Sequence, residues 1–186
     1  VVVTLIVRNV QAEAACRQAE AAELARARAE VRALRAQINP HFLFNALNTI
    51  RYFVRTDPET ARRLLLDLSE VFQRAFRSGE FVPLQDELSY VEAYLALEKA
   101  RLGDRLRVEW DVQAQDLLDH PVPTLILQPL VENAVIHGVA VRPEGGTVRI
   151  TIAQEGGNLL LQVADDGPGI PPAHLTEILN SGHKAI

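Results

Sequence analysis

The sequence contains no methionine and only one cysteine, Cys16, in 186 residues. A single cysteine excludes an intramolecular disulfide, as is typical of proteins in a reducing compartment. Because no initiator methionine is present, the chain is expected to be a fragment of a longer protein. No cleavable signal peptide is recognisable in it.

A long hydrophobic run is also missing at the N-terminus, where the apolar stretch covers only residues 1–7. A membrane-spanning helix needs about 20 apolar residues. Arginines follow the stretch, beginning with Arg8 and Arg17, and basic residues just beyond a membrane helix mark its cytoplasmic side. We therefore expect residues 1–8 to be the end of a transmembrane helix. The alternative is a short apolar strand or the start of a helix of another kind.

Charge of one sign does not dominate the chain either. The net charge is -5, and acidic and basic residues are mixed along the sequence. The lack of a basic stripe argues against nucleic-acid binding. Apolar residues make up 48% of the chain, which is enough for a folded core and excludes a disordered tail.

Glycine and proline are absent from residues 9–38, whose alanine-, glutamate- and arginine-rich composition favours a helix. Apolar residues at heptad positions predict a short coiled coil there: Leu24, Ala27, Val31, Leu34 and Ile38. A second helix is predicted from Glu59 to Arg77, with one apolar face made of Ala61, Leu65, Leu68, Phe72, Ala75 and Phe76. Between the helices, Asp57 is a candidate N-cap and Pro58 suits a helix start.

The short link predicts that residues 20–77 form a helical hairpin with antiparallel arms. A lone hairpin would expose the apolar faces of both helices. Two copies can bury these faces as a four-helix bundle, so the pattern itself predicts a homodimer.

Beyond Ser78 and Gly79, helical and strand patterns are interleaved. Helices are predicted over residues 84–102 and 124–137, and strands over residues 105–112, 147–153 and 158–164. The last two strands are joined by Gln154-Glu155-Gly156-Gly157, which indicates a β-hairpin. These elements predict an α+β fold in which helices cover one face of a mixed sheet.

The first motif with chemical potential is QINPHFLFNALN, residues 37–48. A proline within helix-forming sequence costs about 3 kcal/mol, so Pro40 predicts a kink. It directly precedes His41, and a neutral imidazole is a competent nucleophile near neutral pH. Two interpretations stay open: a reactive His41, or a packed histidine in a kinked helix.

The second motif, LQPLVENAVIHG at residues 127–138, places polar groups on an otherwise apolar helix. Asn133 and His137 are four residues apart and therefore share a face. The carboxamide oxygen of Asn133 suits Mg²⁺, which prefers oxygen ligands. The alternative is a helix C-terminal turn capped by His137 and Gly138.

The third motif, DDGPGI at residues 165–170, follows a predicted strand. Gly167 and Gly169 allow a tight turn in which a ligand can approach the backbone. The carboxylate of Asp165 can accept a hydrogen bond from an adenine amino group. The alternative is an ordinary Asp-Gly turn.

The order and spacing of the three motifs resemble the LytS-like sensor histidine kinases. The ATP-binding domain of that family has the fold shared by gyrase, Hsp90, histidine kinases and MutL (the GHKL fold). The motifs resemble, in order, the family's phosphoacceptor box, its N box and its first glycine box. The likeness covers about residues 30–180, including FVPLQDELSYVEAYLALEKARLGDRL between the first two motifs.

This resemblance implies a protein-histidine kinase that uses ATP to phosphorylate itself on His41. The phosphoryl group then passes to the receiver domain of a response regulator. The resemblance also implies that Asn133 binds Mg²⁺ and that Asp165 recognises adenine. The remaining residues assigned to the nucleotide pocket are His137, Gly167 and Gly169. The full-length protein is expected to be a homodimer anchored at the cytoplasmic face of the bacterial inner membrane.

Two further residues are candidates for catalytic roles. Asn45 lies one helical turn after His41, and commoner histidine kinases place Thr or Asn at this offset, which implies support of phosphatase activity toward the regulator. The alternative is that Asn45 only packs. Glu132 is a candidate general base by residue type alone.

The chain departs from the family in three respects. Ile136 stands where the N box usually has a basic residue, no carboxylate directly follows His41, and the chain stops at Ile186, before the nucleotide lid and the second glycine box. This fragment is therefore expected to bind ATP weakly or to be inactive. The alternative function is a non-catalytic dimeric nucleotide-binding switch, or a pseudokinase, on the same fold.

The expected domain organisation follows from these assignments. It comprises the end of a possible transmembrane helix (1–8), a coiled-coil linker (9–30), a dimerisation and phosphoacceptor hairpin (31–79) and an incomplete ATP-binding domain (80–186).

Overall fold

The structure of the chain is a computed structural model that describes residues 40–75, 79–113 and 115–169. The expected membrane-helix end and coiled coil fall on residues 1–38 and lie outside these ranges. Within the described ranges, no helix is both long and apolar enough to cross a membrane.

The chain forms two compact units, residues 1–43 and residues 44–186. His41 belongs to the first unit. The residues that follow residue 43 belong to the second unit.

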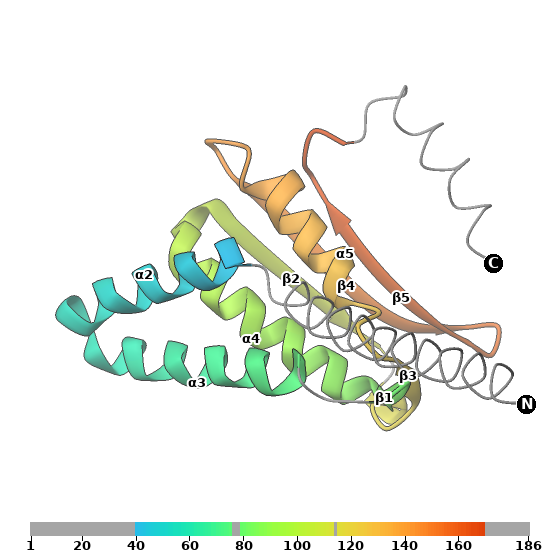
Figure 1. Cartoon of the computed structure of the whole chain (residues 1–186). Helices are drawn as coiled ribbons and strands as arrows, with labels where there is room; N and C mark the ends of the chain where they lie inside the picture. Colours follow the sequence, from blue (N-terminus) through green and yellow to red (C-terminus); the bar gives the residue numbers. More distant parts are fainter. Residues whose placement is uncertain (1–39, 76–78, 114, 170–186) are drawn as a thin grey trace, which may run out of the picture. The chain divides into compact units, whose positions relative to one another are not determined.

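Two helices open the described chain: α2 (Pro40–Thr56) and α3 (Pro58–Ala75). They are joined by Asp57 and run antiparallel as the arms of a hairpin (Figure 1). Asp57 is the N-cap of α3 as predicted, because its Oδ1 accepts a hydrogen bond from the Thr60 backbone N–H at 3.2 Å. The predicted start at Glu59 was one residue late, since Pro58 already occupies the first turn, where its missing N–H costs nothing.

The buried face of α3 differs by one position from the prediction. The buried residues are Ala61, Leu64, Leu68 and Val71, whereas the predicted Leu65 has an exposed fraction of 49%. Helix α3 packs against α4, and periodicity alone does not decide which row of an apolar helix face is covered by a neighbour. Phe72 is half-buried, and the side chains of Ala75 and Phe76 lie outside the described part.

Helix α4 (Leu84–Leu102) has the predicted bounds and contacts α3, α5 and strand β2. Because these neighbours cover it on several sides, many of its residues are buried, among them Leu88, Val91, Tyr94, Leu95 and Glu98. The helix ends at Gly103, whose φ of 62° is a left-handed conformation that glycine adopts without strain. A short 3-10 turn, η1 (Gly103–Arg105), leads from there into the sheet.

The main sheet has the strand order β2-β4-β5. Strand β2 (Leu106–Val112) is parallel to β4 (Gly146–Glu155), and β4 is antiparallel to β5 (Asn158–Asp165). The sheet is therefore mixed, and the α+β prediction is confirmed. A second ladder pairs β1 (Phe81–Pro83) with β3 (Pro121–Pro123), and a 3-10 turn, η2 (Gln115–Leu117), precedes β3.

The two faces of the sheet differ in polarity. Val148, Ile150 and Ile152 alternate along β4 and are fully buried, whereas Arg149 between them is exposed. The β4–β5 turn is tighter than predicted, because only Gly156 and Gly157 lie between the strands. Both have positive φ, at 57° and 84°, as two-residue hairpin turns require.

The predicted helix over residues 124–137 is wrong at both ends. Helix α5 (Gln128–Asn133) begins four residues later and continues as a π-helix, η3 (Ala134–Val139). A helix cannot start at residue 124, because Leu125 has a φ of 64°, outside the right-handed helical region. The segment contacts β4 and β5, and Figure 1 shows it lying across the sheet.

Candidate functional site

The second and third motifs meet where η3 ends and β5 ends. A Cβ atom on Gly138 would lie 2.7 Å from Cγ of Asp165. A Cβ atom on Gly167 would lie 2.9 Å from the carbonyl oxygen of Gly138 and closer still to its Cα. At Gly167 the obstacle is the Gly138 backbone, so no side chain fits there, whereas at Gly138 the obstacle is the Asp165 carboxylate. The two glycines thus let the N box and the glycine box pack closely.

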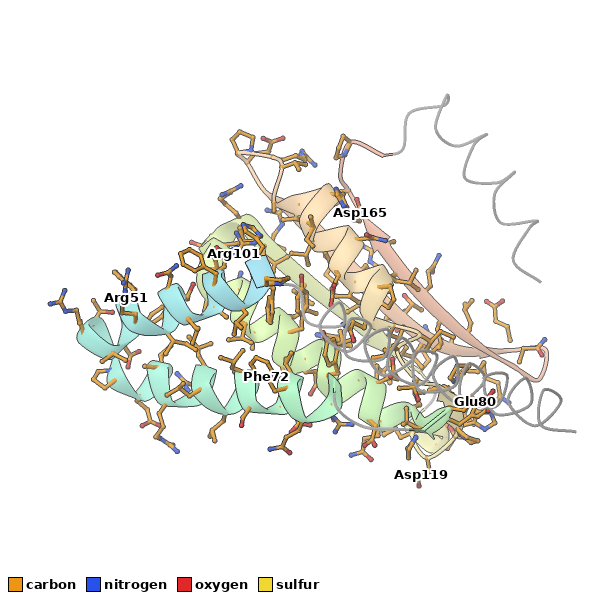
Figure 2. All side chains as sticks on the ribbon, viewed as in Figure 1. Arg51, Phe72, Glu80, Arg101, Asp119 and Asp165 are labelled. Carbon is orange, nitrogen blue, oxygen red and sulfur yellow. The ribbon has the colours of Figure 1, made fainter. Side chains whose placement is uncertain are left out.

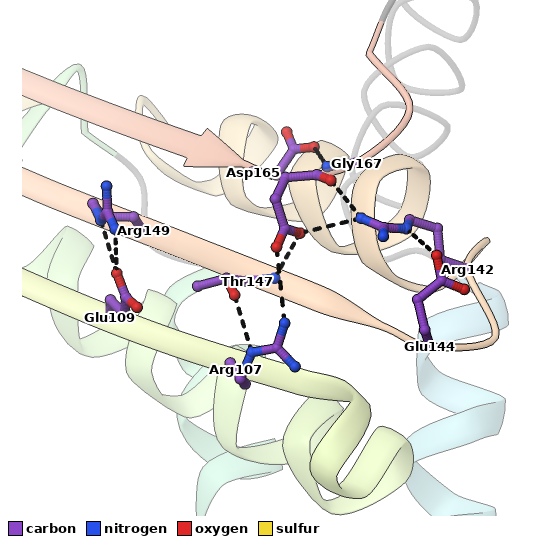
Figure 3. A network of polar contacts seen from close by, with 9 residues as sticks. Arg107, Glu109, Arg142, Glu144, Thr147, Arg149, Asp165 and Gly167 are labelled. Atoms are coloured by element: carbon purple, nitrogen blue, oxygen red, sulfur yellow. Dashed lines mark hydrogen bonds and ion pairs between the residues drawn. The ribbon is translucent and has the colours of Figure 1, made fainter.

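Asp165 points to the helix-covered face of the sheet. It lies opposite the buried Val148 in the β4–β5 register, and directly opposed residues share a face. Its Oδ1 accepts a hydrogen bond from the Gly167 backbone N–H at 2.9 Å, and its side chain is exposed (Figures 2 and 3). The bond fixes the carboxylate while leaving it accessible to a ligand that can donate a hydrogen bond.

Asp166 points to the opposite face. Its Oδ1 accepts a hydrogen bond from the Thr147 backbone N–H at 2.8 Å, and its carboxylate lies 3.8 Å from Arg107 and 3.6 Å from Arg142. The Thr147 hydrogen bonds are the main reason that the pKa of Asp166 lies below its ordinary value. This network ties the end of β5 to the start of β4 and to the loop before it (Figure 3).

Asn133 and His137 are exposed at the end of α5 and within η3. The Ala140 backbone N–H donates to the Val135 carbonyl at 2.8 Å, an i to i+5 bond that marks the widened turn. Single π-helical turns of this kind are frequent at functional sites. The turn brings the buried Gly138 against Asp165 while Asn133 stays accessible one turn earlier.

Two family models match the chain. The model described as "Histidine kinase" matches residues 29–106, and the model described as "Histidine kinase-, DNA gyrase B-, and HSP90-like ATPase" matches residues 119–184. Sensor histidine kinase BtsS of Escherichia coli K12 is 45% identical over 74% of the chain, and sensor histidine kinase YpdA of the same strain is 41% identical over 78%. Sensor protein LytS of Bacillus subtilis is 40% identical over 81%.

The chain belongs to the LytS-like sensor histidine kinases. It spans about a quarter of the length of these relatives, 24% of BtsS and 26% of YpdA and LytS. The histidine kinase domain of the Erythrobacter litoralis EL346 blue-light activated histidine kinase is 20% identical, with a TM-score of 0.38 over 76% of this chain and 71% of that one.

The ATPase-type domain of this histidine kinase chain implies ATP binding. The close contact between Gly138 and Gly167 brings the second and third motifs to one place, with the exposed Asp165 carboxylate beside it. Among the residues that the structure describes, no group of three or more His, Cys, Asp or Glu side chains could hold a metal ion.

Glu132, the candidate base, faces helix α4. Its Oε1 accepts hydrogen bonds from the Tyr90 hydroxyl at 3.1 Å and from Gln128 Nε2 at 2.7 Å. Burial, together with the nearby Glu132, raises the pKa of the Tyr90 hydroxyl. Glu132 thus joins α5 to α4, and its role as a base stays a prediction without geometric support.

The kinase's candidate phosphoacceptor, His41, is exposed near the start of the described part of α2. Asn45 is half-buried, and its backbone carbonyl accepts a hydrogen bond from the Thr49 hydroxyl at 2.9 Å.

Gly169, the second glycine of the third motif, has a φ of 71°, and a Cβ atom there would meet no described atom within 4 Å. The roles of Asp166 and Tyr90 were not predicted from the sequence. The strict alternation of side chains along a strand is the signal that separates Asp165 from Asp166.

Proposed function

We propose that this chain is the catalytic region of a homodimeric sensor histidine kinase that binds ATP and phosphorylates His41. The observation that supports this best is the contact between the N box and the glycine box, where Asp165 lies against Gly138 and Gly167. The phosphoryl group would then pass to an aspartate on the receiver domain of a response regulator. Residues 31–79 would carry dimerisation and His41, and residues 80–186 would bind the nucleotide.

In this proposal each residue at the site has a separate task. The carboxylate of Asp165, oriented by the Gly167 N–H, accepts a hydrogen bond from the adenine amino group. The carboxamide oxygen of Asn133 holds Mg²⁺, which when bound neutralises charge on the phosphates. The neutral imidazole of His41 forms a bond to the γ-phosphorus of ATP as the bond to the β–γ bridging oxygen breaks, so ADP leaves with that oxygen.

The proposed nucleotide pocket can be tested with substitutions at Asp165 and Asn133 and with a control substitution at Asp166. Asp165→Asn is expected to weaken MgATP binding by roughly 10- to 150-fold, because a charge-assisted hydrogen bond is worth about 1.5–3 kcal/mol. Asn133→Asp is expected to impair Mg²⁺-dependent binding by changing the charge at the metal. The matched control is Asp166→Asn, which points to the other face of the sheet and should bind nearly like the parent.

Calorimetric titration of the full-length protein with MgATP measures all three variants. The pocket is elsewhere if Asp165→Asn and Asn133→Asp both bind like the parent. Equal losses in Asp165→Asn and Asp166→Asn would indicate a general disturbance of the strand end and would also contradict the assignment.

The homodimer is supported by apolar side chains that α2 and α3 leave exposed in a single chain: Phe44, Leu47, Leu65 and Leu66. Exposed apolar patches of this kind mark interaction surfaces. We propose that a second copy covers them and completes the four-helix bundle. Membrane anchoring of the full-length protein, and its response regulator partner, belong to the same proposal.

Two leucines on α3 separate dimerisation from folding. Leu68 is buried within the chain at 6% exposure, so Leu68→Glu places a charge in the core and is expected to lower the free energy of unfolding by several kcal/mol. Leu65 is exposed at 49%, so Leu65→Glu should give a folded monomer. Light scattering measures the mass of the particle, and so shows whether it is a dimer. Circular dichroism measures the helical content, and so shows whether the variant is folded. A monomeric parent, or a Leu65→Glu dimer as stable as the parent dimer, would end the bundle proposal.

A further inference from the structure

Helix α4 buries two glutamates that have different partners. Glu87 and Glu98 are exposed by only 5% and 4%. Glu98 pairs with Arg101, one turn away on the same helix. Glu87 instead reaches a distant segment: its Oε1 accepts a hydrogen bond from the Leu125 backbone N–H at 2.8 Å, and its Oε2 accepts one from the Leu127 backbone N–H at 3.2 Å. Both oxygens of a buried carboxylate therefore hold the loop that leads into α5.

The held loop contains a backbone conformation that needs support. Leu125 is the one non-glycine residue with positive φ, 64°, among those the structure describes. Left-handed backbone is unfavourable for a residue with a branched side chain, and it persists only when its surroundings impose it. The hydrogen bond from the Leu125 N–H to Glu87 is such a constraint.

The second hydrogen bond fixes the start of α5. Leu127 is the N-cap residue of the helix, and its carbonyl accepts from the Val131 N–H at 3.1 Å. The first amides of a helix have no partner within the helix, and a carboxylate is favourable there. Glu87 thus supplies an acceptor where α5 begins, and the helix reaches Asn133 only six residues later.

A neighbouring residue on α4 holds the other end of α5. Tyr90 lies one turn after Glu87, and its hydroxyl donates to Glu132, the residue before Asn133. Helix α4 therefore contacts α5 through Glu87 at its start and through Tyr90 at its end. These contacts hold α5 close to its first and its last residue, before it continues into η3, so they bear directly on the position of Asn133.

We propose that Glu87 is a positioning residue for nucleotide binding: by holding the backbone of Leu125 and Leu127 it sets the start of α5, and thereby the place of Asn133. This inference rests on the nucleotide site proposed above. Glu87 does not touch the ligand itself, and its effect is transmitted through the helix.

The test compares Glu87→Gln with Glu98→Gln in the full-length protein. Glutamine keeps the shape of glutamate, but its amide nitrogen cannot accept a hydrogen bond, so one of the two loop amides loses its partner. We expect amide hydrogen exchange over residues 125–133 to quicken at least tenfold in Glu87→Gln. We also expect the Kd for MgATP to rise by about tenfold, with the strands β4 and β5 as protected as in the parent. Glu98→Gln, equally buried on the same helix, should leave both measurements near the parent values.

Each outcome decides the inference. Unchanged exchange over residues 125–133 in Glu87→Gln contradicts the clamp, and quickened exchange with an unchanged Kd contradicts its role in nucleotide binding. If Glu98→Gln quickens the exchange and raises the Kd for MgATP as much as Glu87→Gln does, the loss of any buried charge on α4 explains the effect. That result would overturn the inference. A parent protein that binds no MgATP would contradict the proposed function, and with it the positioning role, while the exchange data would still decide whether Glu87 holds α5.

Discussion

His41→Gln is expected to abolish autophosphorylation while MgATP binding stays near the parent value. The side chain of glutamine is close to histidine in size but has no nucleophilic nitrogen, because the lone pair of its amide is delocalised. His41 is exposed on α2, so the exchange should not disturb the packing of the hairpin. Incubation of the full-length protein with γ-labelled ATP, followed by a test for acid-labile and base-stable label, measures the effect.

The control for this result is another exposed histidine. His120 precedes β3 and lies outside the proposed site, so His120→Gln should keep full labelling. Label that persists in His41→Gln at a different histidine, such as His137, would contradict the assignment of the phosphoacceptor. Loss of label together with loss of MgATP binding would place the defect in the pocket and would leave His41 without its proposed role.

Elements whose bounds depend on local chemistry were predictable from the sequence. Asp57 followed by Pro58 carries its own start signal for α3, and the structure has the expected N-cap hydrogen bond. The paired glycines Gly156 and Gly157 likewise encode the β4–β5 turn. In both cases the residues that determine the structure are neighbours in the sequence, so a pattern can reveal them.

The start of α5 was not predictable, because a distant residue determines it. Residues 124–127 are apolar enough to continue the helix, and only the contact with Glu87, 38 residues before Leu125, shows that the loop holds another conformation. The same reason explains Leu65: periodicity gives an apolar face, but the neighbour α4 decides which row of that face is buried.

At the candidate site, too, the residue types could be predicted from the sequence but their contacts could not. The residue types of Asp165 and Gly167 indicated a nucleotide pocket from the sequence, and the structure places both against Gly138, the last residue of the second motif. Glu132 has the right type for a base, yet its carboxylate is bonded to Tyr90, which no spacing rule reveals. A motif thus predicts which residues gather at a site, whereas their hydrogen-bond partners come from packing.

Gly167→Ala is expected to remove most nucleotide binding. The added methyl group would lie 2.9 Å from the Gly138 carbonyl oxygen and 2.6 Å from Oδ1 of Asp165, and closer still to the Gly138 Cα. A clash with backbone cannot be relieved by rotating a side chain, so the glycine box must move away from η3. Overpacking of this kind costs about 1–3 kcal/mol, which corresponds to a loss of roughly 5- to 150-fold in affinity if the displacement falls on the site.

The control variant should also replace a glycine and strain the backbone, but without placing a methyl group against other atoms. Gly156 has a φ of 57° and nothing within 4 Å of a Cβ, so Gly156→Ala costs about 1 kcal/mol in backbone strain at the distant β4–β5 turn. Calorimetric titration with MgATP should therefore separate the two variants, although both lower the melting temperature. If Gly167→Ala binds MgATP as tightly as Gly156→Ala does, contact between the N box and the glycine box does not form the pocket, because the site then tolerates their separation.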